Sequence, residues 1–311
     1  MSEVSVDQGV VLGFGGSNAR RAVNKDGDIF NFTSIDTPTH PEDFFGWMGT
    51  QLLEAAEAGN NWVVAGYPGP VSADGKLVGP FKNIPGLHDK QHELEAELAA
   101  TDAAVGRLLA RKDFRLVNVN DGNLAAHAAT SRIGAFANSR VASLILGSGV
   151  GAGIVYRDPE FSTVYRVDPR IPAEIGHIML NGDPEDTFEN AVSGTALAKM
   201  AVEEKFGKNS RFLPNDHPAW KRTAEAVLQM SNILGLMLGA ELVVPCGGIG
   251  SGAQGEYGPH LNDLLEVYAA RGSATQGLLR PEIIPVPRAD RQVFEMFGGE
   301  GVMRDVYTHA G

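Results

Sequence analysis

Three glycine-rich segments, each directly after a short apolar run, constrain the fold of this chain more than any other feature. They cover residues 13–18, 147–153 and 246–252. Glycines at the end of a strand let the backbone approach a ligand closely and turn N–H groups toward phosphate oxygens. Taken singly, such a segment is more often a tight turn, and none has the Walker or the Gly-x-Gly-x-x-Gly spacing.

Apolar runs and helical spacing predict the elements between these segments. A helix is expected to begin near Pro41, with Glu42 and Asp43 in its first turn, and to stop at Gly59. The other expected elements are strands at 10–12, 20–23, 62–66, 115–119, 141–146, 154–156 and 242–244, and helices at 91–111, 194–206, 218–240 and 300–307. This alternation favours an α/β fold in which each half begins with a strand–glycine loop–strand hairpin.

Composition excludes several classes of protein. The chain has 311 residues, which suits two lobes better than one core, and a formal net charge of −12. Nucleic-acid and anionic-membrane binders usually need a basic surface, so neither partner is expected. Cys246 is the only cysteine, which excludes an internal disulfide and a zinc site with two or more thiolates. The first residues lack a signal-peptide pattern and no apolar run could span a bilayer, so we expect a cytoplasmic protein.

Two polar motifs carry candidate chemistry. Asn120-Asp121-Gly122-Asn123 follows an expected strand, where α/β proteins bind ligands, so Asp121 is a candidate base; the same residues also favour a turn or a helix N-cap. In Glu174-Ile175-Gly176-His177 the acid and the imidazole would share one face of a helical turn. The two side chains could bind one polar ligand or pair with each other. A metal site is less favoured, because few other residues that could coordinate a metal lie nearby in the sequence.

Eight short segments follow one another along the chain: Gly15-Gly16-Ser17, Pro68-Gly69-Pro70, Asn83-Ile84-Pro85-Gly86-Leu87, Asn120–Ala126, Gly147–Gly153, Glu174–His177, Glu189–Gly194 and Gly247-Gly248. This series resembles the ROK family of sugar kinases and repressors over nearly the whole sequence. The resemblance implies the two-lobed α/β fold of the actin-like, hexokinase-type ATPases (ribonuclease H-like), with a ligand cleft between the lobes. Residues 1–118, with a C-terminal helix at 298–311, would form the small lobe, and residues 119–297 the large lobe.

The resemblance also implies a role for each matching position. The first phosphate loop is matched by Gly15, Gly16 and Ser17, and the second by Gly147, Ser148, Gly149 and Gly151. The adenosine segment is matched by Gly247 and Gly248. Residues that hydrogen-bond sugar hydroxyls are matched by Asn83, Asn120, Glu174, His177 and Glu189. Asp121 matches the general base that takes the proton of the attacking hydroxyl. ATP and Mg²⁺ are the implied cofactors, because phosphoryl transfer depends on an aligned nucleophile and on neutralised phosphate charge.

Two positions depart from the family pattern. ROK members usually carry a cluster of zinc-binding cysteines after the histidine motif, but residues 181–186 contain none, so no zinc is expected and His177 should be free of metal. The family also has an aspartate two residues before the first Gly-Gly pair, where it helps to position magnesium, and Gly13 stands there. The loss of such a carboxylate would weaken the alignment of the γ-phosphate, commonly by a factor of roughly 10–100.

We therefore expect an ATP-dependent hexose kinase, glucokinase-like, that acts at the 6-hydroxyl of glucose or a close relative. The alternative is a non-catalytic sugar-binding sensor, an inactive kinase of the same fold. The reason to consider it is that Gly13 stands in place of the family's aspartate. A DNA-binding repressor is disfavoured, because those proteins place a helix-turn-helix ahead of the sugar fold and only about nine residues precede the first strand here. Family members are commonly dimers, which implies a homodimer. Residue types alone leave the hexose and the phosphate donor open.

Overall fold

The computed structural model describes residues 8–81, 84, 86–133, 140–167, 175–250, 281–284, 286, 290 and 293–309. Contacts divide the chain into two compact units, one of residues 1–131 with 295–311 and one of residues 132–294. Each unit contains a five-stranded sheet, ordered β3-β2-β1-β4-β7 in the first and β10-β9-β8-β11-β12 in the second. In both sheets an antiparallel hairpin precedes a parallel pair. The hairpin expected at the start of each half is thus confirmed.

The first unit follows the predicted alternation of strands and helices. Its elements are β1 (Gln8–Phe14), β2 (Asn18–Lys25), β3 (Asp28–Asp36), α1 (Pro41–Glu57), β4 (Trp62–Tyr67), β5 (Leu77–Val78), β6 (His92–Glu93), α2 (Leu94–Thr101), α3 (Ala103–Leu109), β7 (Arg115–Asn120), α4 (Asp121–Arg132), the 3₁₀ helix η4 (Phe294–Phe297) and α10 (Gly298–His309). The helix α1 begins at Pro41 as expected, and Gly59 follows its end with a φ of +81°. Such an angle suits glycine, which has no Cβ to clash.

Two expectations for this unit are wrong. The single helix predicted over residues 91–111 is a short strand and two helices, because Asp102 adopts an extended conformation and its side chain accepts a hydrogen bond from the Ala104 N–H at 2.7 Å. That bond caps a new helix and so ends the previous one. The strand β3 was not expected; it pairs antiparallel with β2 and is largely exposed at the edge of the sheet.

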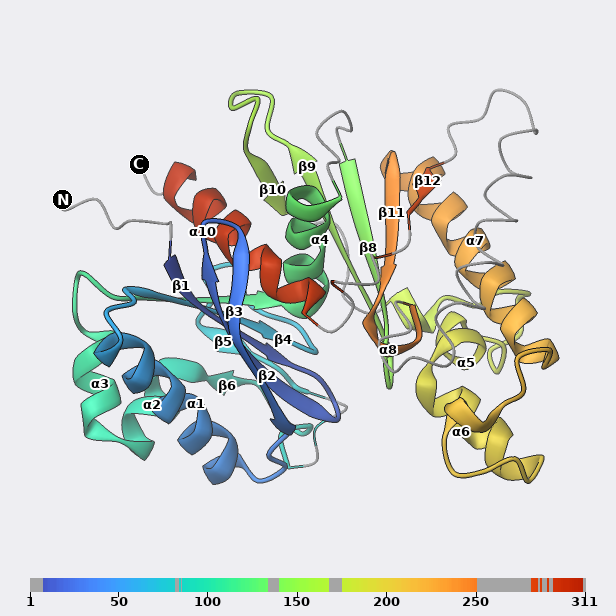
Figure 1. Ribbon diagram of the computed structural model, residues 1–311, viewed down its shortest axis with the longest axis horizontal. Helices are drawn as coiled ribbons and strands as arrows, with labels where there is room; N and C mark the ends of the chain where they lie inside the picture. The colour runs from blue at the N-terminus through green and yellow to red at the C-terminus, as the bar shows by residue number, and fades with distance from the viewer. Residues whose placement is uncertain are drawn as a thin grey trace. The chain divides into compact units, whose positions relative to one another are not determined.

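Helices cover both faces of the first sheet (Figure 1). On one face, α1, α2 and α3 pack against β1 and β4. The apolar core between them includes Leu12, Met48 and Leu52. On the other face α10 contacts β1 and β4. A side chain at Gly299 would overlap Val11, so this glycine lets α10 approach the sheet closely.

In the described part of the second unit, helices pack on one face of the sheet. Its described elements are β8 (Arg140–Leu146), β9 (Val150–Arg157), β10 (Tyr165–Val167), the 3₁₀ helix η2 (Ile175–His177), α5 (Phe188–Val192), α6 (Gly194–Glu203), the 3₁₀ helix η3 (Ser210–Phe212), α7 (Pro218–Leu238), β11 (Leu242–Cys246), α8 (Gly247–Gly250) and β12 (Glu282–Ile283). Alternate residues of β8, such as Leu144 and Leu146, pack with α5, α6 and α7 around Trp220. The expected loop at 147–153 is shorter, because β9 begins at Val150. Among the described residues, no helix is both long and apolar enough to cross a membrane.

Candidate active site

The first glycine turn joins β1 to β2 and is braced by the chain that follows β3. The Gly15 N–H donates to the Asn18 carbonyl at 2.8 Å, which closes the turn. Thr37 donates from Oγ1 to the Gly15 carbonyl at 2.7 Å and from its N–H to the Ser17 carbonyl at 3.0 Å. The Gly15 and Ser17 carbonyl oxygens thus accept hydrogen bonds from Thr37, and these bonds hold the turn in one conformation.

Asn120 and Asp121 lie at the same sheet edge as this turn. The strands β1, β4 and β7 are parallel neighbours, so their carboxyl ends meet at one edge, where α/β sheets bind ligands. Asp121 is the half-buried first residue of α4, and its Oδ1 accepts a hydrogen bond from the Gly122 N–H at 2.8 Å. The start of a twelve-residue helix stabilises a negative charge there.

The buried Asn120 side chain holds the proline turn that follows β4. Its Nδ2 donates to the Tyr67 carbonyl at 3.3 Å and to the Gly69 carbonyl at 3.0 Å, and its Oδ1 accepts from the Gly122 N–H at 2.9 Å. An amide has two N–H donors, so both are used here and a further partner can only be accepted at Oδ1. Asn120 therefore positions Tyr67, Gly69 and the start of α4 relative to one another.

Stacked rings extend from this edge toward the segment around residue 83. Phe14 stacks on Tyr67 with a centroid distance of 5.2 Å, and Tyr67 stacks on Phe81 at 5.5 Å. Such pairs add stability beyond the buried area, by about 1 kcal/mol each. Burial raises the pKa of Tyr67, whose hydroxyl donates to Asn118 Oδ1 at 3.1 Å. The predicted sugar ligand Asn83 itself lies outside the described residues.

In the second unit, a glycine turn follows β8, and the short glycine-rich helix α8 directly follows its parallel neighbour β11. The Gly147 N–H donates to the Gly149 carbonyl at 3.0 Å, and the Gly147 carbonyl accepts from the Gly194 N–H at 2.7 Å, at the start of α6. Thr195 Oγ1 donates to the Ser148 carbonyl at 2.6 Å. Gly151 does not belong to this turn; it lies in β9, opposite Ile145.

The helix α8 requires glycine at its first residue. Gly247 has a φ of +79°, and a Cβ there would lie 2.8 Å from the Leu146 carbonyl oxygen. The backbone at the end of β11 therefore touches the end of β8. A Cβ at Gly248 would meet no described atom within 4 Å.

Glu189 and His177 are brought to the same part of the second unit. The half-buried Glu189 on α5 accepts a hydrogen bond at Oε2 from the Val150 N–H, at 3.0 Å. A Cβ at Gly176 would lie 3.2 Å from the same Oε2 atom, so η2 passes directly against Glu189. His177 is the next residue and is exposed. The other member of the predicted pair, Glu174, lies outside the described residues.

A hydrogen-bonded hairpin connects His177 to Glu189, in the place where the family carries zinc-binding cysteines. Its two sides are joined by bonds from the Leu180 N–H to the Asp186 carbonyl and from the Phe188 N–H to the Ile178 carbonyl, both 2.8 Å. Two side chains of α7 tie it down: Arg222 pairs with the Asp186 carboxylate, and Gln229 Nε2 donates to the Leu180 carbonyl at 3.1 Å. Sequence reasoning missed both contacts.

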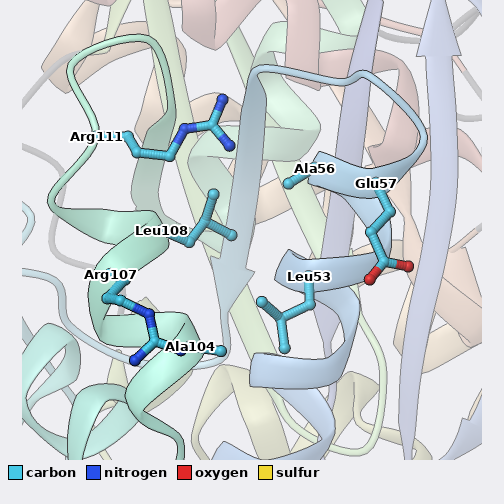
Figure 2. Close-up of a pocket in the computed structure, with 7 residues that line it drawn as sticks. All are labelled: Leu53, Ala56, Glu57, Ala104, Arg107, Leu108 and Arg111. Carbon is cyan, nitrogen blue, oxygen red and sulfur yellow. The ribbon is translucent and has the colours of Figure 1, made fainter.

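The pocket in Figure 2 is separate from these residues. It has a volume of about 420 Å³ and lies between the ends of α1 and α3, with Leu53 and Leu108 inside and Glu57, Arg107 and Arg111 around it. Glu57 and Arg111 come shortly before β4 and β7, so the pocket is at the amino ends of the parallel strands. Asp121 and the glycine turn are at the opposite edge of the sheet.

The sequence matches no protein-family model and no curated protein. The structure, in contrast, is similar to solved sugar kinases over almost its full length. The ROK hexokinase from Thermus thermophilus has a TM-score of 0.67 at 19% identity, over 97% of this chain and 99% of that chain. The ROK family glucokinase from Streptomyces griseus, solved with glucose and AMPPNP, has a TM-score of 0.70 at 17% identity, over 95% and 98%. The inorganic polyphosphate/ATP-glucomannokinase from an Arthrobacter species has a TM-score of 0.63 at 17% identity, over 97% and 99%.

These similarities establish the fold. The chain has the α/β fold of the solved ROK sugar kinases, as the order of its motifs predicted. A fold of this kind hosts more than one activity, so function has to be argued from the site residues.

Proposed function

We propose that this chain is an ATP-dependent hexose kinase that phosphorylates the 6-hydroxyl of glucose or a close relative. The observation that carries the proposal is the position of Asp121. It is a half-buried carboxylate at the first residue of α4, on the same sheet edge as the Gly15–Ser17 turn. The similarity to solved hexokinases and glucokinases supports the same activity.

In this proposal Asp121 acts as the general base. It accepts the proton of the sugar hydroxyl while the hydroxyl oxygen attacks the γ-phosphorus of ATP and the bond to the β-phosphate oxygen breaks. The hydrogen bond from the Gly122 N–H fixes the orientation of the carboxylate. Orientation matters because the reacting atoms have to be about 3 Å apart and aligned.

The glycine turns are proposed to bind the nucleotide. The turns at Gly15–Ser17 and Gly147–Gly149 would receive the phosphates, and Gly247 and Gly248 the adenosine. Mg²⁺ binds through one or two carboxylates, waters and phosphate oxygens, and Asp121 supplies a donor of that type. When bound, the ion neutralises phosphate charge.

Glu189 and His177 are proposed to hydrogen-bond sugar hydroxyls. Glu189 has one oxygen on the Val150 N–H, and a carboxylate can accept several further bonds. Asn120 contributes at most one acceptor, so its main role is to position the proline turn. Asn83 and Glu174 retain the roles that the resemblance implies. A polyhydroxyl ligand needs such a set of amide, carboxylate and imidazole groups, because each buried hydroxyl has to be paired.

The proposal is tested by measuring ADP release with Mg-ATP in the presence of glucose, mannose, fructose, N-acetylglucosamine or N-acetylmannosamine, and without sugar. We expect release above the sugar-free background with glucose or a close relative. Polyphosphate is tested as a second donor, because the Arthrobacter neighbour is named a polyphosphate/ATP-glucomannokinase; the readout is then the sugar phosphate, since this transfer leaves shortened polyphosphate and no ADP.

The alternative is a sugar sensor without phosphoryl transfer. One observation favours it: no carboxylate projects from Gly13, and a Cβ at this position would lie 2.5 Å from Met296 Cε. A sensor would show a sugar-dependent rise in melting temperature and no ADP release with any of the five sugars.

A further inference from the structure

A carboxylate from the far end of the sequence lies beside the strand that leads into the first glycine turn. In the β1–β2 hairpin, Gly13 is paired with Arg20. The guanidinium of Arg20 forms an ion pair with Glu295 Oε1, and the Glu295 side chain is only 16% exposed. The Arg20 side chain is 32% exposed, so the pair is screened less by solvent than a fully exposed pair but more than a buried one.

The short helix η4 occupies the space beside Gly13. A Cβ built at Gly13 would lie 2.5 Å from Met296 Cε and 3.9 Å from Glu295 Cγ. The Met296 methyl group therefore occupies the place of a Gly13 side chain, and the Glu295 side chain lies in van der Waals contact with that place. Their placement brings an acidic group within one side-chain length of β1, two residues before the turn at Gly15.

Further contacts hold η4 in this place. The fully buried Asn24 donates from Nδ2 to the Met296 carbonyl at 3.1 Å. Directly after η4, α10 packs against β1 and β4. Glu295 is therefore oriented from two sides, by Arg20 and by the backbone of η4.

A carboxylate beside a phosphate-binding turn is repelled by the phosphates unless a cation lies between them. Arg20 offsets part of the Glu295 charge but uses one carboxylate oxygen, and a carboxylate has further lone pairs to accept bonds from metal-bound water. Mg²⁺ bound to a nucleotide keeps several waters and takes few protein ligands. One oriented carboxylate near the turn is therefore sufficient to hold the water molecules of such an ion in place.

We propose that Glu295, held by Arg20, is the positioning residue that orients the hydrated Mg²⁺ of the nucleotide at the first glycine turn. The inference rests on the proposed kinase function. It assigns to η4 the carboxylate that is missing at Gly13, and it makes the Arg20–Glu295 pair part of the nucleotide site.

The test is the Mg²⁺ dependence of nucleotide binding, measured by titration calorimetry with AMPPNP, with and without Mg²⁺. In Glu295→Gln the gain in affinity that Mg²⁺ gives should fall by about 10- to 100-fold, as when an outer partner of a metal is lost. Binding without Mg²⁺ should not weaken and is expected to tighten, because the neutral Gln side chain no longer repels the phosphates. The control is Glu300→Gln, an acid of α10 that pairs with Arg304 and should keep the full Mg²⁺ effect.

Glu295→Asp separates a chemical role from a packing role. The Asp side chain keeps the charge but is shorter, whereas Gln keeps the shape but is neutral. If Glu295 orients the ion, Asp retains more of the Mg²⁺ effect than Gln does. If Gln retains as much as the wild type, or more than Asp, the inference is overturned while the kinase proposal stands. If the wild-type protein binds no nucleotide under either condition, both are overturned.

Discussion

Arg222 on α7 pairs with Asp186, which lies in the hairpin between His177 and Glu189. The same carboxylate accepts a hydrogen bond from Asn181 Nδ2 at 2.5 Å, and these two partners lower the pKa of Asp186. The hairpin is therefore cross-linked to α7 by a charged group and to itself by an amide. These contacts hold the hairpin between His177 and Glu189 in one arrangement.

Arg222→Ala should raise the KM for the sugar with little change in kcat. The substitution frees one side of the hairpin, so Glu189 and His177 lose orientation, whereas Asp121 belongs to the other unit and stays in place. We expect an increase of about tenfold, below the roughly 100-fold cost of a full misplacement by 1 Å. The control is Lys221→Ala, its exposed neighbour, which pairs with Glu225 on the same helix. Equal effects of the two variants would contradict this role.

Lowering the pH should destabilise the first unit through His127. This residue of α4 is 1% exposed and its Nε2 lies 3.9 Å from Asp305 Oδ2 of α10. Burial nevertheless dominates and lowers the pKa of His127 from 6.5 to about 4. The unfolded chain therefore binds a proton that the folded protein rejects, so stability falls as the pH drops from about 6.5 to about 4.

The full effect is about 3 kcal/mol in the free energy of unfolding, at 1.36 kcal/mol for each pKa unit. It is measured by urea unfolding at pH 7 and pH 4.5, in the wild type and in His127→Gln, because other acids also titrate in this range. The variant should lose less stability between the two pH values. An identical loss in both proteins would show that His127 does not titrate on unfolding.

Gly66→Ala should lower kcat by displacing the start of α4. A Cβ at Gly66 would lie 2.8 Å from Leu124 Cδ2 and 3.6 Å from the Asp121 Cα atom. A shift of Asp121 by a fraction of an ångström is expected to cost roughly 10- to 100-fold in kcat. The matched control is Gly46→Ala in α1, where an added Cβ meets nothing within 4 Å and where alanine favours the helix. A wild-type kcat in Gly66→Ala would show that the approach of α4 to β4 does not position the base.

Local patterns in the sequence were sufficient to predict most of the secondary structure. The helix at Pro41 and the strands β4, β7 and β8 begin and end close to the expected residues, because caps, glycine stops and apolar runs are encoded locally. The helix expected at 91–111 was wrong, since the N-cap signal of Asp102 was overlooked. The turn predicted at 147–153 ends earlier in the structure, because Gly151 lies in β9. Glycine is tolerated within a strand as well as in a loop.

Contacts between distant segments could not be predicted in the same way. Glu189 meets Val150, 39 residues away, and Arg20 meets Glu295, 275 residues away. Neither pair has a local pattern, because both depend on how helices pack against a sheet. The absence of an acid at Gly13 was visible in the sequence, but the acid that lies beside Gly13 in space was not.

The central claim, that Asp121 is the base of a sugar kinase, is tested most directly by Asp121→Asn. The control is Asp102→Asn, which neutralises a carboxylate that also bonds a backbone N–H at a helix start, but on α3. With glucose or whichever sugar supports the reaction, we predict that Asp121→Asn lowers the rate of ADP release by about 10²- to 10⁴-fold, with Asp102→Asn close to the wild type. Sugar phosphorylation at the wild-type rate in Asp121→Asn would contradict the account.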